Sequence, residues 1–294
     1  MEWSKAKNIL IMIFLALNLF LGYSLWEDIY LNYPSRIISQ KEIEEAEARL
    51  EAVNLELKIN ISPQIFTMSF LTVSNQEQQG EILAEKLLDP EQPFSFNKGT
   101  EGTPQVYRQD KNQIYIWENG RVIFTREPMV DLEQSQDEVL EEGAAISLAE
   151  EYLENAQLLP VDARLEEVHS IGDNRYQIRY NQVYKNQTLY GGYLLVQITP
   201  RGLEQFELYW LDPQGFSGQE MNNISAAAAL GRLADSLEPF SERTAVESMN
   251  IGYYSEVFDA QKWDMVPVWR IRLSNRRTYY INAYTGELEG IEEL

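Results

Sequence analysis

Two stretches of this chain correspond to each other at a constant separation of 85 residues. Leu203–Glu207 (LEQFE) matches Leu288–Glu292 (LEGIE), and the helical patterns at 139–152 and 224–237 match at the same separation. Each helical pattern is followed by segments that alternate apolar and polar residues, as strands do. A repeat of one helix and an antiparallel meander accounts for this order, and chance similarity is the alternative.

The first 28 residues indicate a membrane anchor. Lys5 and Lys7 precede an almost entirely apolar run at 8–26, and Glu27 and Asp28 follow it. About 18 apolar residues at roughly 1.5 Å each form a helix of about 27 Å, close to the hydrocarbon thickness of a bilayer. Because lysines before a span favour a cytoplasmic N-terminus, we expect a single-pass protein of the cell membrane with its C-terminal part outside the cytoplasm.

A cleaved signal peptide is the alternative interpretation of this segment, but no A-x-A-like cleavage site follows the apolar run. Asn18 is the strongly polar side chain in the middle of the predicted span. It either bonds the backbone of its own helix or reaches a neighbouring transmembrane helix, a contact worth about 0.6–2 kcal/mol. The second interpretation makes Asn18 a candidate for partner binding.

Charge and composition exclude several classes of function. The formal net charge of −22 opposes binding to nucleic acid and to anionic lipid surfaces. The absence of cysteine excludes disulfides, thiolate metal sites and thiol nucleophiles. We therefore interpret most of the 46 acidic residues as a solvated surface.

The pattern along the chain predicts an α+β protein. Between the anchor and the repeat we expect a helix over 40–52, several strands, and a hairpin at Asn119-Gly120, which is a strong turn signal. The predicted division is a cytoplasmic tail (1–7), the anchor (8–26), a juxtamembrane stalk helix (27–54), an N-terminal α+β unit (55–134) and two helix–meander units (135–212 and 222–294).

No catalytic motif is present in the sequence. Nucleophile elbows, zinc-binding H-E-x-x-H sequences, phosphate loops and dinucleotide fingerprints are all missing. His169 fits a surface position on a strand, and the acidic pairs fit solvated faces: Glu141-Glu142, Glu166-Glu167 and Glu292-Glu293. We therefore expect a protein that is not an enzyme and needs neither cofactor nor metal.

Aromatic residues gather near the C-terminus, among them Trp269, Tyr280 and Tyr284. Because side chains alternate along a strand, only half of them can face one core. They either fill a thin core between sheet and helix or form an exposed aromatic face of the kind that protein interfaces favour. A basic cluster adjoins them and could bind an acidic partner or pair with internal glutamates: Arg270, Arg272, Arg276 and Arg277.

Both ends of the chain resemble one protein family. The opening MEWSKAKNILIMIFLALNLFL is similar to the start of YycI proteins of low-GC Gram-positive bacteria, in which W-S-K-x-K-x-I leads into an anchor with an N-L-F-L-like element. The closing YYINAYTGEL at 279–288 is similar to the PepSY-like ending of YycI and YycH. The order of helices and strands between the ends also looks alike.

This resemblance implies a regulatory function. YycI and YycH are single-pass membrane proteins that associate with each other and with the YycG (WalK) sensor histidine kinase, and so modulate two-component control of cell-wall metabolism. The resemblance places Trp3, Ser4, Lys5 and 18–21 in the family's anchor pattern, and it implies no catalytic residues. We take these residues as candidates for partner interaction: Asn18, Leu19, Phe20, Leu21, Trp269, Arg272, Tyr280 and Tyr284.

Two other functions are compatible with parts of the sequence. The turn within 279–288 alone would also suit a PepSY-type extracytoplasmic inhibitor of a protease, or an envelope chaperone. A wall-remodelling hydrolase would need two carboxylates that converge in a cleft, and the sequence singles out no such pair.

Overall fold

The computed structural model describes residues 38–126, 139–172, 174–256 and 260–293, and near the N-terminus residues 7, 11–15, 17, 18, 20 and 21. The described N-terminal residues are helical and exposed. Across the described residues, no helix combines the length and the apolar character that a membrane crossing requires. The predicted anchor lies partly, and the stalk over 27–37 wholly, outside the described residues, so both stay predictions.

The fold is α+β with mostly antiparallel strand pairing, as the sequence predicted. The helices beyond residue 37 are α2 (Gln40–Ala52), α3 (Gly80–Leu87), α4 (Glu142–Asn155) and α5 (Ala226–Ser236). The strands are β1 (Leu55–Leu57), β2 (Thr67–Asn75), β3 (Ser95–Asn97), β4 (Gln105–Gln109), β5 (Asn112–Ile116), β6 (Val122–Arg126), β7 (Ala163–Ser170), β8 (Tyr176–Tyr184), β9 (Gln187–Thr199), β10 (Gly202–Tyr209), β11 (Leu211–Asn222), β12 (Thr244–Tyr254), β13 (Lys262–Leu273), β14 (Arg277–Asn282) and β15 (Leu288–Glu293). These strands form one continuous sheet.

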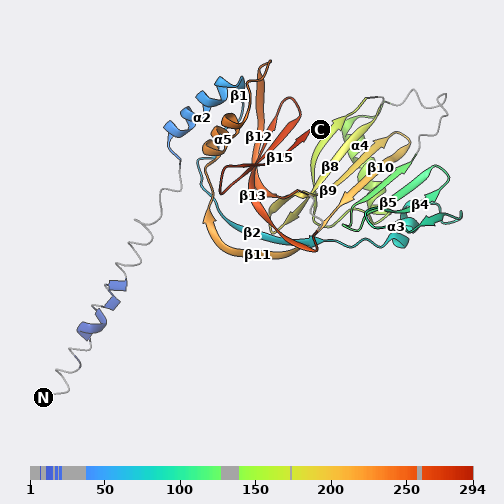
Figure 1. The fold of residues 1–294 in the computed structure, drawn as a ribbon, viewed down its shortest axis with the longest axis horizontal. Helices are drawn as coiled ribbons and strands as arrows, with labels where there is room; N and C mark the ends of the chain where they lie inside the picture. Colours follow the sequence, from blue (N-terminus) through green and yellow to red (C-terminus); the bar gives the residue numbers. More distant parts are fainter. Residues whose placement is uncertain are drawn as a thin grey trace.

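One order of elements occurs twice in the chain (Figure 1). The first repeat unit is α4 followed by β7–β10, and the second is α5 followed by β12–β15; within each unit every strand pairs with the next one in the chain. The last strand of each unit also carries a one-residue bulge, at Glu204 in β10 and at Glu289 in β15. These two bulges stand 85 residues apart, so the units correspond in detail at this point.

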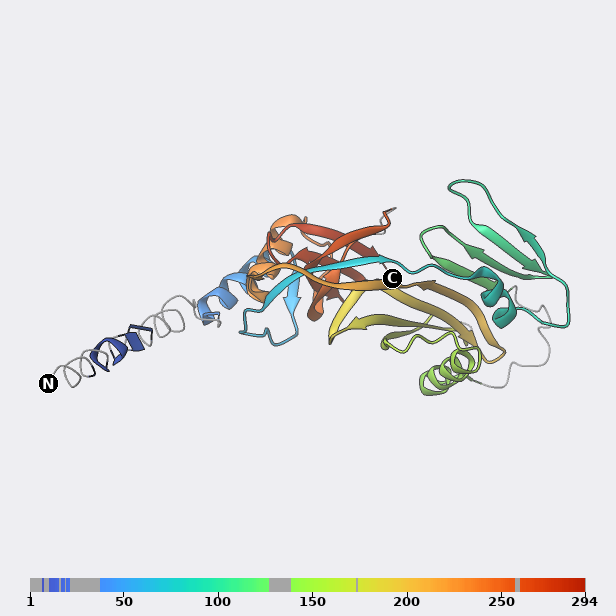
Figure 2. The same ribbon diagram turned by 90° about the horizontal axis from the view of Figure 1, so that it is seen from below.

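The residues before the first repeat unit contact both units (Figures 1 and 2). Helix α2 lies beside α5, and β1 pairs in parallel with β12. Strand β6 pairs with β10, and β5, β4 and β3 continue the sheet outward from it. Strand β2 lies between β11 and β13. The packing thus divides the predicted unit at 55–134 between the two repeats, and the boundaries predicted from sequence stay untested.

Two large hydrophobic clusters hold the fold together. The first packs α3 and α4 on the sheet of the first repeat unit and contains Phe124, Ala149 and Phe206. The second packs α2 and α5 on the sheet of the second unit and contains Leu50 and Trp269. Burial of apolar area at about 25 cal/mol per Å² makes such clusters the main source of stability.

Helices α4 and α5 differ in composition because they are covered differently. Helix α4 buries a single stripe, formed by Ala145, Ala149 and Leu153, and exposes glutamates on its outer side. Helix α5 buries most of its residues, since the sheet covers one side and α2 another. Alanine at most of these positions lets the two helices approach closely. Ser225 caps α5 by accepting a hydrogen bond from the backbone N–H of Ala228 (3.1 Å).

Candidate functional site

The N-terminal candidates for partner interaction lie on the described part of the first helix. Asn18, Phe20 and Leu21 are helical and exposed, whereas Leu19 lies outside the described residues. The side-chain amide of Asn18 donates to the carbonyl of Phe14 (2.8 Å), which is the local bond expected of a tolerated amide in a helix. This bond uses one of its two amide hydrogens and leaves the other and the oxygen for further partners.

The C-terminal aromatic candidates are mostly inside the protein. Trp269 is 3% exposed, and its indole N–H donates to the carbonyl of Ile224 (3.0 Å). Tyr280 is 1% exposed and stacks on Tyr254 with ring centroids 4.0 Å apart. Tyr284 is half-buried, and its hydroxyl donates to the carbonyl of Met68 (2.7 Å). Of the two alternatives, a filled core is therefore confirmed for Trp269 and Tyr280, and an exposed aromatic face is wrong for both.

The physical reason is that β13 and β14 are covered on both faces. Trp269 belongs to the cluster under α2 and α5. Tyr280 lies on the opposite face, where it packs with Tyr190 of the first repeat unit. Alternation along a strand separates the two faces but does not reveal that a second layer covers the other one.

A buried network of arginine and glutamate joins the two repeat units at this second face. We call this region of contact between the units the junction. Arg270 on β13 is 2% exposed and donates to Glu166 and Glu167 on β7. Arg272, two residues further along β13 and on the same face, donates to Glu167 (2.9 Å). The basic cluster is thus used at least partly for internal pairing, and the candidate Arg272 is one of its members. His169 completes the group with a contact to Glu167 (3.1 Å).

The interpretation of Glu166-Glu167 as a solvated pair is wrong. The register of β7 on β8 shifts between Leu165 and Glu167, so Glu166 is an extra residue in a β-bulge. A bulge turns consecutive side chains away from strict alternation, and here both carboxylates reach the guanidinium of Arg270. A bulge of this kind has no signature in the periodicity of the sequence.

The network determines the charge state of Glu167. Burial alone raises the pKa of this carboxyl, but the charge of Arg270 and the hydrogen bonds from His169, Arg270 and Arg272 outweigh burial and lower the pKa to about 2. Glu167 therefore stays ionised at neutral pH. A buried ion pair contributes little net stability by itself, but removing one partner leaves an uncompensated charge, which is costly.

A second ion pair also joins the two repeat units. Arg179 on β8 donates to Asn181 and to Glu292 on β15, and Tyr280 donates to the same Glu292 (2.8 Å). The charge of Glu292 outweighs burial and raises the pKa of Arg179, so the guanidinium stays charged. Burial, reinforced by Glu292, raises the pKa of Tyr280 well above its usual value. Glu292 was interpreted as solvated, and it is instead half-buried at the junction.

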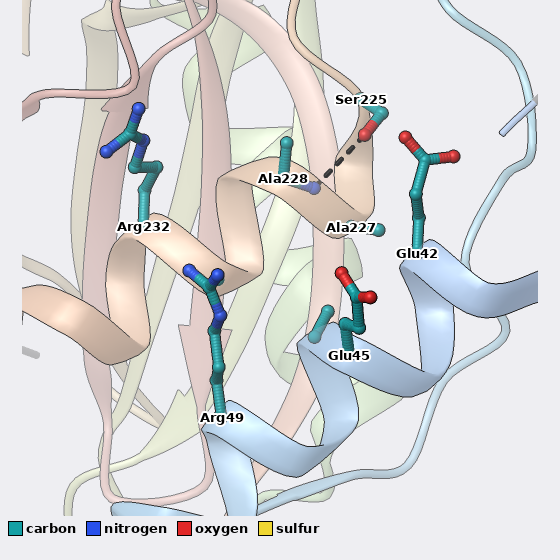
Figure 3. Close-up of a pocket in the computed structure, with 9 residues that line it drawn as sticks. Glu42, Glu45, Arg49, Ser225, Ala227, Ala228 and Arg232 are labelled. Atoms are coloured by element: carbon teal, nitrogen blue, oxygen red, sulfur yellow. Dashed lines mark hydrogen bonds between the residues drawn. The ribbon is translucent and has the colours of Figure 1, made fainter. Parts of the chain in front are cut away.

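Two hollows accompany these contacts. A cavity of about 160 Å³ opens at the junction beside Arg179, Tyr193, Tyr254 and Glu292. A groove of about 320 Å³ lies between α2 and α5 (Figure 3). Glu42 and Glu45 lie toward one end of this groove, and Arg49 and Arg232 lie toward the other (Figure 3). Among the described residues, no group of acidic or histidine side chains is arranged to hold a metal ion.

The sequence contains one signal for the junction, on β13. Arg270 and Arg272 alternate with Trp269, Ile271 and Leu273, all of which are core residues. Arginine at alternate positions of a buried strand needs carboxylate partners, because buried charges are paired. The partners of these two arginines, Glu166 and Glu167, are more than 100 residues away in the sequence, and no local pattern identifies them.

Comparison with known proteins decides the family. The sequence model of the family described as YycI protein matches residues 35–284, which is most of the chain. The chain belongs to the YycI family. Membership supports, at the level of the family, a role in the YycG/WalK regulatory system of two-component control. The match covers α2, the whole first repeat unit and the second unit as far as Tyr284, so the middle of this YycI-family chain also fits the family.

The fold also occurs in a solved structure. An uncharacterized protein from Eubacterium rectale, determined at 1.45 Å, matches this YycI-family chain with a TM-score of 0.53 and 11% identity. The match covers 88% of this chain and 100% of that one. At such low identity the likeness shows a common fold alone. No curated protein matches the chain.

Proposed function

We propose that this protein is a membrane-anchored, non-enzymatic regulator that binds a YycH-like membrane protein and a sensor histidine kinase of the YycG/WalK type outside the cytoplasm. The observation that carries the proposal is the YycI family match over 35–284. The partners follow from what the family does, and the two repeat units supply the surface that meets them.

The N-terminal residues support a membrane location. Described residues of the predicted span expose large apolar side chains, from 52% for Leu17 to 71% for Met12. An apolar helix surface of this kind is stable in lipid and costly in water. We propose one uncleaved span at 8–26 with the N-terminus in the cytoplasm, and contact with a partner's helix through 18–21.

The junction supports a binding role for the extracytoplasmic part. The ion pairs of Arg179 and Arg270 fix the two repeat units against each other. A fixed pair of units presents a constant surface to a partner, and so lowers the entropy lost on binding.

Affinity purification from native membranes tests the proposal. The full-length protein should bring down a sensor kinase and a YycH-like protein, whereas co-purification of an envelope protease would favour the PepSY-type inhibitor instead. Asn18→Leu should reduce the recovered kinase or YycH-like protein about 3- to 30-fold, because it removes an interhelical hydrogen bond worth about 0.6–2 kcal/mol. Met12→Leu is the matched control, since it keeps the span apolar, retains Asn18 and lies outside 18–21. Unchanged recovery with Asn18→Leu would place the contact outside the membrane.

A further inference from the structure

Strands β10 and β15 end the two repeat units and correspond to each other, but only β10 is paired on both edges. In the first unit β9 lies on one side of β10 and β6 on the other. In the second unit β15 pairs with β14, and within the described residues no strand occupies its other edge. The backbone groups along that edge can therefore accept another strand.

Side-chain burial follows the same difference. Leu203 and Phe206 of β10 are 1% and 0% exposed. The residues at the corresponding positions of β15 are Leu288 and Ile291, which are 39% and 52% exposed. In the first unit, Phe124 of β6 lies directly opposite Phe206 and helps to bury it. The second unit has the same apolar positions without the strand that covers them.

Charge indicates what kind of strand fits. Arg121, which immediately precedes β6, donates to Glu207 of β10 (2.8 Å). Glu292 corresponds to Glu207, and its neighbour Glu293 is 68% exposed at the side chain. An incoming strand that resembles β6, with apolar residues flanked by arginine or lysine, would cover Ile291 and meet these carboxylates.

Two other edges of the sheet, at β11 and β3, are protected against such pairing. The outer edge strand β11 contains Pro213, two register shifts and the left-handed glycines Gly215 and Gly218. Strand β3 at the far end has only three residues. Prolines, bulges and short length are the usual devices that keep sheet edges from pairing with other chains. Strand β15 has one bulge, at Glu289, and its last four residues pair regularly with β14.

We propose that the free edge of β15 binds an extended, basic and apolar segment of a partner protein by strand addition, with that segment in the place that β6 has on β10. This proposal rests on the proposed function, since it gives the partner a binding site. A second copy of this chain fits less well, because two β15 strands would bring Glu289, Glu292 and Glu293 against the same acidic residues.

A peptide copied from this chain is the probe. Residues 119–126 (NGRVIFTR) contain β6 and its preceding arginine, and a fluorescent form should bind the full-length protein saturably in detergent. Ile291→Arg should weaken this binding at least tenfold, because it removes the apolar contact and repels the basic peptide. Met221→Arg, at a comparably exposed position on β11, should leave binding within twofold. A peptide with both arginines changed to glutamate should not bind.

The outcomes separate this proposal from the proposed function. Peptide binding should slow amide hydrogen exchange in 288–293 and not in β11. Absence of binding, binding that Ile291→Arg does not change, or an Ile291-dependent dimer of the protein would overturn strand addition at β15. Recovery of the kinase and the YycH-like protein that is equal for Ile291→Arg and the unchanged chain would also overturn it while leaving the proposed function intact. Peptide binding without recovery of either partner would contradict the proposed function and leave strand addition at β15 intact.

Discussion

In the first repeat unit the residues that precede the repeats extend the sheet from its last strand, where β6 pairs with β10. In the second unit they pair instead with its first two strands, through β1 and β2, and cover α5 with α2. The two units have the same strand order and the same bulge in their last strand. Their surfaces nevertheless differ, with an acidic outer side on α4 and an exposed last strand in β15. The repeated element thus determines the topology, and the flanking chain determines which faces are buried.

The largest effect is expected where the two units meet. Arg270→Met should lower the free energy of unfolding by about 3–5 kcal/mol, because Glu166 would lose its ion pair and the buried Glu167 would keep only Arg272 and His169 beside it. Denaturant unfolding of the full-length protein, followed by tryptophan fluorescence, measures this. Arg277→Met is the control, since its pair with Glu293 is exposed and worth at most about 1 kcal/mol. Equal losses for the two variants would contradict a structural role for the junction.

Leu50→Ala tests whether the two repeat units are stabilised by separate hydrophobic clusters. Leu50 on α2 is fully buried in the second hydrophobic cluster, and its truncation should cost about 2–5 kcal/mol. Hydrogen exchange should become faster in α5 and β14 and change less in α4. Leu153→Ala on α4 is the matched variant, with a similar cost and the opposite distribution. Equal loosening of both units by each variant would show that the units unfold as one.

Acid should weaken the junction. The pKa of Glu167 is lowered from 4.5 to about 2, so the unfolded chain takes up this proton more readily than the folded one. The stability that Glu167 contributes is therefore present above about pH 4.5 and lost as the pH falls toward 2, by up to about 3 kcal/mol. Unfolding curves between pH 5 and pH 2 test this. Glu167→Gln should reduce the loss of stability between pH 5 and pH 2. An unchanged dependence of stability on pH would contradict the lowered pKa of Glu167.

The smallest effect is expected from substitutions at equivalent positions in the last strand of each repeat unit. Gly290 of β15 corresponds to Gln205 of β10, and a Cβ atom at Gly290 would lie 2.5 Å from the hydroxyl of Tyr254. Gly290→Gln should therefore cost about 1–3 kcal/mol through overpacking. Gln205→Gly should cost only about 0.5–1 kcal/mol, the usual penalty for glycine in a strand. Thermal unfolding of both variants measures the difference, and equal costs would show that Tyr254 moves aside freely.

Local patterns predicted the local structure well. The Asn119-Gly120 hairpin is present between β5 and β6, with Gly120 in the left-handed region, and the helix predicted over 40–52 is α2. Helix followed by meander was also predictable in both units, because it depends on periodicity within short segments.

Contacts between distant segments were not predictable in this way. The aromatic side chains of Trp269 and Tyr280 are buried because layers from elsewhere in the chain cover both faces of their strands. The burial of Glu167 depends on a bulge in β7 and on arginines more than 100 residues away. Periodicity reports which residues share a face, whereas burial of that face depends on tertiary packing.

The attachment of α2 and β1 to the second unit has a consequence for the order in which the protein folds. The side-chain amide of Asn54 donates to the carbonyl of Phe240, 186 residues later in the chain. The first hydrophobic cluster, by contrast, draws on a contiguous stretch from Leu83 to Trp210, so it can form as soon as that stretch has been synthesised. Helix α2 must wait for nearly the whole chain, and closing so long a loop is slow. A nascent chain therefore carries α2 uncovered until translation is almost complete.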